Sequence, residues 1–469
     1  MGNRDVFECF LDYFLIEEKG VYMPLLKKAC AAWNIREEEL QNVIQVRMQQ
    51  YHRTDHQAMR KVLALYLKEW LYIEALKENS EQMKIYFNVP GAMCAMYWIK
   101  QSLDCNAYLG TPDLITMVVL YGILGRKTKM ETNGCRHCAV NVMRLLLRTE
   151  QQIPEPDIRC TFGLVCDEAP KQDLLIEMTE SETTHFYIHS PVRGRDEKLY
   201  LERQVEDMIK KIATKYHVLF DEKEYWKIKN VRFNLSAKID QIIQFISRSK
   251  SFLLSNADIG LLETLLLASF QTDMNEIVLM LDDLYHEIRH TSGKEIKYKF
   301  CIYYTPVCNP QYGRIMEENG IALLYQTAFV SNAVYTGSYR VTEDIAAECC
   351  GMIITKSVYE EADKISDVIC RRRFDGLLLG MFTFDRWMGA QQNLLKTLVE
   401  KKTGKRVYIY ETDFWNQEIF SPERMYAMVE TWTEMLEEEK SETRSIITDR
   451  KPVPGMPAEA AGPIYRRKR

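Results

Sequence analysis

The fold is decided by the consecutive segments SVYEEADKISDVICRRRF (357–374), DGLLLGMFT (375–383), QNLLKTLVEKKTGK (392–405) and RVYIYE (406–411). The first and third segments space their apolar residues as amphipathic helices do, whereas the second and fourth are short runs typical of strands. A chain that alternates strand and helix in this way forms a parallel sheet covered by helices on both faces. The sequence therefore predicts an α/β fold.

The same alternation occurs at two places upstream. IKYKFCIYYT (296–305) has the pattern of a strand, and RIMEENGIALLY (314–325) that of a helix, a glycine stop and another strand. Much earlier, IRCTFGLV (158–165) and HFYIHS (185–190) are also typical of strands, and AVNVMRLLLRT (139–149) of a helix. We therefore expect two parallel-sheet domains.

The remaining chain is predominantly helical in pattern. Residues 1–82 and the charged, almost glycine-free residues 195–290 both show helical spacing of apolar residues. The two sheet domains are thus expected to be joined by a helical layer and preceded by a helical extension. The predicted organisation is an N-terminal helical extension (1–85), a first α/β domain (86–192), a helical connecting region (193–292), a second α/β domain (293–440) and a polar C-terminal tail (441–469).

Composition excludes several classes of protein. The chain has 61 Lys and Arg against 66 Asp and Glu, which gives a net charge of −5. Such a balance lacks the excess of positive charge that is typical of proteins that bind nucleic acid or an anionic membrane. No apolar run reaches the ~18 residues of a membrane span, and the opening MGNRDVFECF is no signal peptide. We therefore expect a cytoplasmic protein, whose 13 cysteines serve packing, metal binding or redox chemistry.

The sharpest local cluster of chemical groups is Cys135-Arg136-His137-Cys138, followed 28 residues later by Cys166. A Cys-x-x-Cys pair can bind zinc or an iron–sulfur cluster, or carry out thiol exchange. A zinc ribbon requires a second close pair, and a thioredoxin-type site requires a strand before the motif; neither is clear in this sequence. Alternatively, these cysteines have only a structural role.

A second motif, His286-Glu287-Ile288-Arg289-His290, matches the zinc-protease pattern H-E-x-x-H. Its context is the end of an amphipathic helix, so a solvated helix end is the favoured interpretation. The sequence has no G-x-x-x-x-G-K-[ST], no G-x-G-x-x-G after a strand and no G-x-S-x-G. The chain is therefore not expected to hydrolyse ATP by itself or to bind NAD in the usual way.

Ligands of parallel sheets bind beyond the carboxyl ends of the strands. Three predicted strands end beside residues of chemical interest: Cys166, Cys308 and the segment Phe382–Trp387. These strand ends are the candidate site on pattern alone.

The order of these elements, together with four short motifs, resembles the 2-hydroxyacyl-CoA dehydratase and benzoyl-CoA reductase family, over roughly residues 85–440. The four matching stretches are Gly134–Cys138, Leu164–Lys171, Tyr303–Gly320 and Phe374–Leu378 with the helix that follows it. The resemblance implies Rossmann-like sheet domains and a two-subunit component that holds [4Fe-4S] clusters.

By that resemblance, Cys138 and Cys166 correspond to the first two cluster ligands. The family has a third cysteine where this chain reads Phe384-Asp385-Arg386. Asp385 would then ligate iron through oxygen, or the chain holds no catalytic cluster. Cys135 and Cys308 are alternative ligands, although neither stands at the family position, and Cys160 is a further candidate.

The implied activity is removal of water from a 2-hydroxyacyl-CoA through a ketyl radical on the thioester carbonyl. The implied partners are a homologous second subunit, giving a heterodimer, and an ATP-dependent iron–sulfur activator that supplies the electron. Three alternatives stay open: a non-catalytic partner subunit of such a complex, a benzoyl-CoA reductase-like subunit, and a structural-zinc or redox protein that uses Cys135 and Cys138 on an unrelated α/β fold.

Overall fold

The structure is a computed structural model. It describes residues 5–88, 91–126, 139–164, 168–189, 196–303, 309–326, 340–352, 356–382, 386–412 and 421–448. The chain divides into two compact units, residues 1–422 and 423–469. The described part of the second unit is helix α18 (Pro422–Thr448), which continues into the segment predicted as a polar tail. The predicted domain boundaries stay predictions.

The first sheet is formed by β1 (Lys84–Phe87), β2 (Tyr108–Gly110), β3 (Ile158–Gly163) and β4 (Thr184–His189). All neighbouring strands are parallel, in the order β2-β1-β3-β4. The two central strands, β1 and β3, are buried along their whole length, as expected for a sheet covered on both faces. The chain first steps outward from β1 to β2 and then crosses over to β3, so the reversal of strand order lies between β1 and β3.

The second sheet repeats this order with β5 (Tyr298–Tyr303), β6 (Ile321–Gln326), β7 (Gly376–Phe382) and β8 (Arg406–Thr412). Its strands are again all parallel, in the order β6-β5-β7-β8. The reversal of strand order lies between β5 and β7. The predicted α/β fold with two parallel sheets is confirmed.

The two sheets also share the same pair of hydrogen bonds at their amino-terminal edge. Asp157 precedes β3, and its carboxylate accepts the backbone N–H of Lys84 at 2.7 Å. Asp375 precedes β7 and accepts the N–H of Lys299 at 2.9 Å. In both pairs the aspartate N–H donates back to the lysine carbonyl at 2.8 Å. Each pair of central strands therefore begins in a fixed register, which sets where its carboxyl ends lie.

Several helices precede β1 or connect the strands of the first sheet. They are α1 (Val6–Tyr13), α2 (Lys19–Ala32), α3 (Glu37–Asn42), η1 (Val43–Arg47), α4 (Met48–Tyr51), α5 (Gln57–Leu76), α6 (Met93–Leu103), α7 (Pro112–Met117), η2 (Val118–Ile123), α8 (Ala139–Thr149) and α9 (Glu168–Glu177). Most residues of α5 are buried, so this helix is part of the core rather than an appendage.

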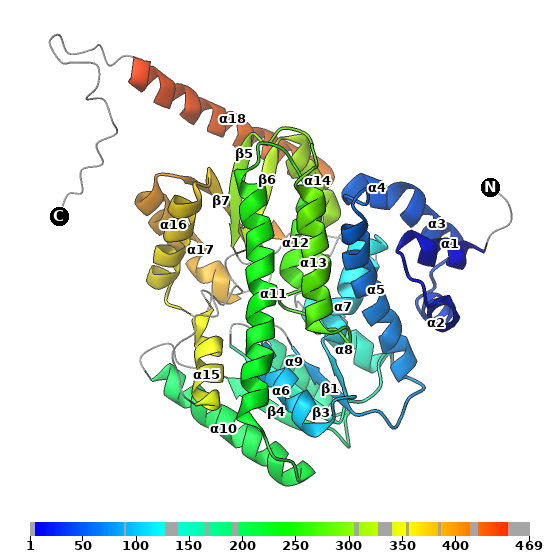
Figure 1. The fold of residues 1–469 in the computed structure, drawn as a ribbon. Coiled ribbons are helices and arrows are strands. Elements are labelled where there is room, and N and C mark those ends of the chain that lie inside the picture. Colours follow the sequence, from blue (N-terminus) through cyan, green and yellow to red (C-terminus); the bar gives the residue numbers. More distant parts are fainter. Residues whose placement is uncertain are drawn as a thin grey trace. The chain divides into compact units, whose positions relative to one another are not determined.

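The connecting region and the second sheet contribute the remaining helices of the first unit. They are α10 (Glu197–Tyr216), α11 (Glu222–Arg248), α12 (Asn256–Thr264), α13 (Met274–Ile288), α14 (Pro310–Glu318), α15 (Val341–Gly351), α16 (Val358–Arg372) and α17 (Arg386–Thr403). The long helix α11 runs beside α13 (Figure 1) and contacts both α6 and β6. A helix of this length thereby links the segments around the two sheets, in agreement with the predicted helical layer.

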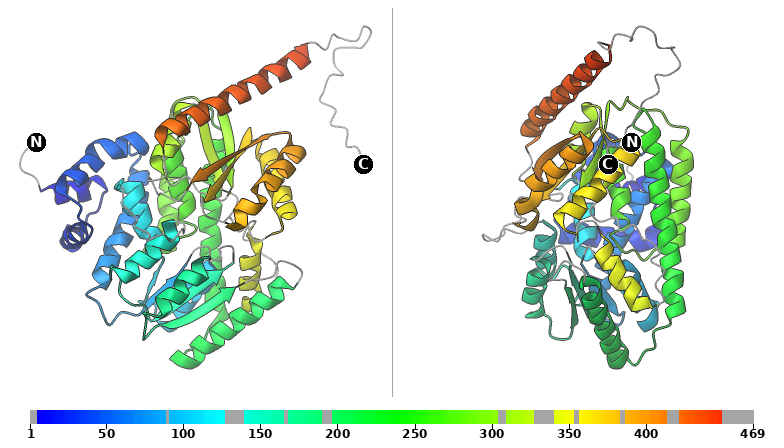
Figure 2. Two further views of the ribbon diagram at one scale, coloured as in Figure 1. Left: turned by 180° about the vertical axis from the view of Figure 1, so that it is seen from behind. Right: turned by 90° about the vertical axis from the view of Figure 1, so that its left-hand side faces the viewer.

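Helix α15 belongs to the crossover between β6 and β7 but packs on α10, which follows β4 (Figure 2). Lys198 of α10 pairs with Glu343 at 2.7 Å. The Tyr225 hydroxyl of α11 donates to the buried carboxylate of Asp344 at 2.6 Å, and Lys229 pairs with the same carboxylate. These contacts make α15 a second connection between the elements of the two sheets.

The H-E-x-x-H segment is a helix end, as predicted. Helix α13 ends at Ile288, and both His286 and His290 are exposed. Both carboxylate oxygens of Glu287 accept the backbone N–H of Ala58 at 3.2 Å, at the start of α5. Glu287 therefore caps a helix. Within the described ranges, none of the helices combines the length and apolarity needed to cross a bilayer.

Candidate functional site

The five candidate ligands lie outside the described residues, next to described elements. Cys166 follows β3, Cys308 follows β5 and Asp385 follows β7, while Cys135 and Cys138 stand between η2 and α8. The strands β3, β5 and β7 each border the point at which their sheet reverses strand order. In open parallel sheets, ligands bind beyond the carboxyl ends of strands at that point.

The carboxyl edge of the first sheet is fixed by Asn88, which directly follows β1. Its side-chain amide donates to the carbonyl of Phe162 at 3.0 Å, and its side-chain oxygen accepts the Phe162 N–H at 2.6 Å. The buried amide thus extends the pairing of β1 with β3 by one step. Gly91 lies so close that an added Cβ would be 2.8 Å from the Phe162 ring. The sequence analysis missed this role of Asn88 at the strand edge, because it depends on a partner 74 residues away.

Helices α7 and α8 are joined by a buried ion pair. Arg144 donates to Asp113 from Nε at 3.1 Å and from Nη2 at 2.9 Å, and both side chains are buried. Its Nη1 donates to the Asn141 side chain at 3.2 Å, three residues after Cys138. The helix that begins just after Cys138 is therefore held in place by charge-assisted bonds. Its N-terminal amides carry the partial positive charge that favours an anion.

Polar contacts continue from this pair to β3. Arg144 Nε lies 3.9 Å from Asp173 of α9, whose other carboxylate oxygen accepts the Thr161 hydroxyl at 2.5 Å. Asp173 and Thr161 are both buried. Helices α8 and α9 are thus tied to the strand that leads to Cys166.

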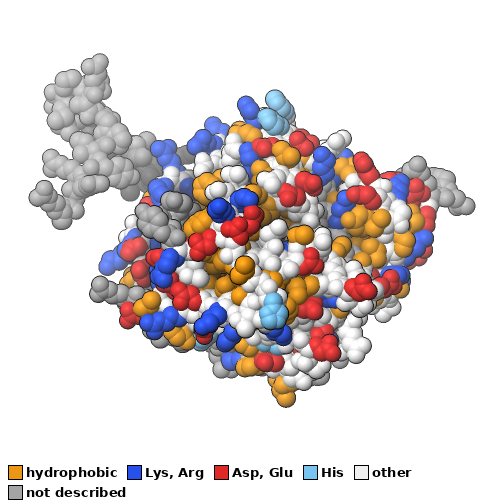
Figure 3. Space-filling model, turned by 60° about the horizontal axis from the view of Figure 1, so that its bottom comes forward, with side chains coloured by type: hydrophobic (Ala, Val, Ile, Leu, Met, Phe, Trp, Pro, Cys, Tyr) orange, Lys and Arg blue, Asp and Glu red, His pale blue; other side chains and the backbone are white. Residues whose placement is uncertain are grey.

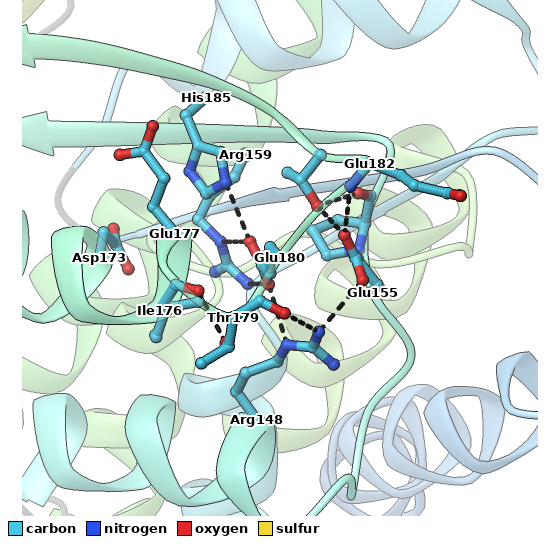
Figure 4. Close-up of polar contacts among 12 residues, drawn as sticks. Arg148, Glu155, Arg159, Asp173, Ile176, Glu177, Thr179, Glu180, Glu182 and His185 are labelled. Atoms are coloured by element: carbon cyan, nitrogen blue, oxygen red, sulfur yellow. Dashed lines mark hydrogen bonds and ion pairs between the residues drawn. The ribbon is translucent and has the colours of Figure 1, made fainter.

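A second buried group of charges lies nearer the amino-terminal edge, around Glu180 (Figure 4). Glu180 accepts from Arg159 at 3.0 and 2.6 Å and lies 3.2 Å from Nε2 of His185 and 3.4 Å from Nε of Arg148. Burial alone would raise the pKa of the Glu180 carboxyl, but the bonds from His185 and Arg159 outweigh it and hold the pKa below its ordinary value. Arg159 is near the start of β3 and Glu180 precedes β4. This group therefore stabilises the sheet at the edge away from the candidate ligands.

The buried cysteines Cys30, Cys160 and Cys350 are poor metal ligands, because ligation uses the thiolate. Burial raises the pKa of Cys30 and Cys160 to about 12 and that of Cys350 to about 11. Cys105 and Cys370 are exposed. Across the described part of the chain, no three His, Cys, Asp or Glu side chains come together as a metal site. Cys160 is thereby disfavoured as a cluster ligand. The candidate ligands that follow strand ends remain Cys166, Cys308 and Asp385.

The surface drawn in Figure 3 mixes basic and acidic side chains, with neither sign dominating that face. This mixture agrees with the balanced composition of the chain. The face therefore gives no basic track of the kind that binds a nucleic-acid backbone.

Two glutamates, the buried Glu69 and the half-buried Glu317, couple stability to pH. Glu69 of α5 accepts the Gln271 N–H at 2.8 Å, and burial raises its pKa to about 7. Glu317 of α14 accepts the Asn256 N–H at 2.6 Å, and burial likewise raises its pKa to about 7. A carboxyl whose pKa is higher in the folded chain favours folding at low pH, and this contribution is lost as pH rises.

We expect unfolding free energy to fall between about pH 4.5 and pH 7, by up to about 3 kcal/mol for each glutamate. Glu69→Gln removes one of these charges, so the variant should lose less stability than the parent between pH 5 and pH 8. Urea unfolding of both proteins at the two pH values measures the difference. An identical pH dependence in the variant would show that Glu69 does not titrate as its burial predicts.

The protein is thus an α/β protein with two parallel sheets. Its candidate site residues follow the carboxyl ends of strands in both sheets. The family model for 2-hydroxyglutaryl-CoA dehydratase, D-component, matches residues 123–436. Because this match covers more than half of the chain, the protein belongs to that family of 2-hydroxyacyl-CoA dehydratase-type subunits. A comparison with curated proteins gave no match.

Proposed function

We propose that the chain is a subunit of an iron–sulfur enzyme that dehydrates a 2-hydroxyacyl-CoA. The family supports a dehydratase of the lyase type. In this proposal the chain pairs with a homologous subunit as a heterodimer, receives an electron from an ATP-dependent activator protein and works in the cytoplasm. A benzoyl-CoA reductase-like reduction of an aromatic thioester is the alternative reaction for the same architecture.

The observation that carries the proposal is the position of the candidate ligands in the chain. In the sequence, Cys166 and Asp385 each stand three residues after the end of a central strand, and Cys138 directly precedes α8. Two thiolates and a carboxylate are donors that iron accepts, although thiolates suit a cluster better. A bound [4Fe-4S] cluster would supply a low-potential electron and an open iron as Lewis acid.

The residues of the chain itself have three tasks in this proposal. Cys138 and Cys166 hold the cluster, with Asp385 as third ligand and Cys135 or Cys308 as alternatives to it. The Arg144–Asp113 pair holds α8 against α7. The Asn88 amide fixes the edge from which Cys166 continues. These tasks are binding and orientation, and the acyl group of the substrate is left open.

A specific observation favours a second candidate, a non-catalytic partner subunit. By the resemblance, Asp385 stands where the family has a cysteine, so the donor set of this chain alone would be weaker than three thiolates. In that case the chain completes the active site of its partner and binds little or no iron by itself.

The test is the iron and sulfide content of the chain, purified without oxygen alone and together with its partner. We expect about four irons per chain. Most of this iron should be lost in Cys138→Ser or Cys166→Ser, because each removes a thiolate ligand. Cys105→Ser and Cys370→Ser replace exposed cysteines and serve as matched controls, which should keep their iron.

Absence of iron from the chain, both alone and in the complex, would overturn the cluster assignment. Zinc analysis of the same sample would then separate a Cys135–Cys138 zinc site from an interaction subunit without metal. Iron that appears only with the partner, and that survives both serine substitutions, would support the partner-subunit candidate.

A further inference from the structure

Helix α15 lies between β6 and β7 in the chain, but it packs on α10, which follows the first sheet. Its buried side carries the apolar residues Val341, Ile345 and Ala346 together with the carboxylate of Asp344. A surface that mixes apolar and charged groups is typical of contacts between domains that open and close. The docking of α15 is therefore a place where the two sheets can be coupled or released.

Ion pairs with α10 surround this docking surface. Lys198 pairs with Glu343 at 2.7 Å, and Nη2 of Arg340 lies 2.6 Å from Glu202. The side chains of Lys198 and Arg340 are 41% and 61% exposed, and pairs with exposed partners contribute little to stability. The strength of docking therefore depends on the buried groups.

Two carboxyl groups stand one turn apart on α15. Asp344 accepts the Tyr225 hydroxyl at 2.6 Å and pairs with Lys229, both from α11. Glu348 comes four residues later, so it lies on the same face of the helix, where like charges repel each other. Because Asp344 already has a cationic partner, this face accommodates one carboxylate more easily than two.

The carboxyl of Glu348 lacks a comparable partner. Its hydrogen-bonding neighbour is the thiol of Cys94, in the first turn of α6. Its Oε2 is buried and has no hydrogen-bond partner among the described residues. The nearby guanidinium of Arg232 donates to the carbonyl of Leu266. A buried carboxylate oxygen without a partner is costly, so the neutral carboxylic acid is the favoured form in the docked helix.

The pKa of Glu348 reflects this balance. Burial raises it above its ordinary value of 4.5, the cations Arg232 and Lys229 of α11 oppose the rise, and Asp344 adds to it. Protonation of Glu348 and docking of α15 therefore favour each other.

The charged groups of α10 act on the two thiols that follow Glu348. Burial raises the pKa of Cys349 and Cys350, and Glu197 of α10 adds to the rise. Lys198 and Lys356 oppose it at Cys350. The group that α10 brings to Cys349, the residue next to Glu348, is thus an acid, which does not favour a second carboxylate there.

We propose that α15 is a proton-controlled latch between the two sheets: it is docked on α6, α10 and α11 while Glu348 is protonated, and it loosens when Glu348 ionises. Because the docked helix holds the proton more tightly than the released one, docking is strongest at low pH and weakens as pH rises through the raised pKa. This latch acts on the connection between the sheets and requires neither iron nor a substrate.

Amide hydrogen exchange of the metal-free full chain tests the latch. Glu348→Gln keeps the shape of the protonated carboxyl but cannot ionise. At pH 8 the amides of α15 should exchange about tenfold more slowly in this variant than in the parent, because each unit of raised pKa corresponds to about tenfold in the docking equilibrium. At pH 5 the two proteins should exchange equally. Each rate is divided by that of α16 in the same sample, which cancels global unfolding.

Glu276→Gln is the matched control, because it neutralises an exposed carboxyl in the first turn of α13. It should leave the ratio of α15 to α16 exchange unchanged. The parent gives a second measurement, since its ratio should rise between pH 5 and pH 8. This rise decides the question if Glu348→Gln does not fold.

Equal ratios in the parent and in a folded Glu348→Gln at pH 8 would overturn the latch. A change shared by α15 and α16 would overturn it as well, because it would report global stability rather than docking. A parent ratio that does not change with pH would have the same meaning. Slower exchange confined to α15, seen in Glu348→Gln at pH 8 and absent at pH 5, supports it.

Discussion

Replacing Glu180 by alanine is expected to lower the free energy of unfolding by about 3–5 kcal/mol. The carboxylate of Glu180 is fully buried and faces Arg159, His185 and Arg148. Removing it leaves the buried Arg159 guanidinium without its partner, and an uncompensated buried charge costs far more than a lost surface pair. Urea unfolding of the metal-free chain at pH 7 measures the change.

Glu182→Ala is the matched control, because Glu182 is exposed and lies only two residues away. It should change the unfolding free energy by less than about 0.5 kcal/mol. A similar small loss for both variants would show that the Glu180 group contributes little. The sign of the pH dependence gives a second check: since the pKa of Glu180 is below its ordinary value of 4.5, its contribution should be lost as pH falls below about that value.

Most strands could be predicted from the sequence, because their signal is local. The runs at 158–163, 298–303, 321–326 and 376–382 are apolar, bounded by turn residues and separated by helical spacing. The strands β1 and β2 were missed, since they have four and three residues and so carry too little pattern. The order of the strands within each sheet could not be predicted either, because it depends on pairings between distant segments.

The candidate ligands could be predicted from residue type and position, but the groups that support them could not. Asp113 and Arg144 are 31 residues apart. In the sequence, each is one charged residue on a helix, where a solvated side chain is the usual outcome. Their roles arise only from burial, which brings together groups without any shared local pattern.

The family match begins at residue 123, so β1 and β2 come from residues outside it. Yet β1 is a central strand, and its pairing with β3 sets the edge from which Cys166 continues. The N-terminal part of this chain is therefore structurally required by the matched part. Removing residues 1–122 would remove half of the first sheet rather than an appendage.

Replacing Asp385 is expected to change iron binding in opposite directions, depending on the new side chain. Asp385→Ala should lower retained iron by roughly 10-fold or more, since the loss of even an outer partner of a metal ligand costs about 10–100-fold in affinity. Asp385→Cys should retain more iron than the parent, because it restores the three thiolates that suit a cluster. Iron content after exposure to a chelator, together with visible charge-transfer absorption, measures both effects.

Asp367→Cys supplies the control, because it places a new thiol on the exposed surface of α16. Its iron content should equal that of the parent, which shows that an added cysteine does not recruit iron by itself. Equal retention in the parent, Asp385→Ala and Asp385→Cys would remove Asp385 from the ligand set and leave Cys135 and Cys308 as the candidates for the third position. A gain in Asp385→Cys alone, with no loss in Asp385→Ala, would mean that the aspartate stands near the iron without binding it.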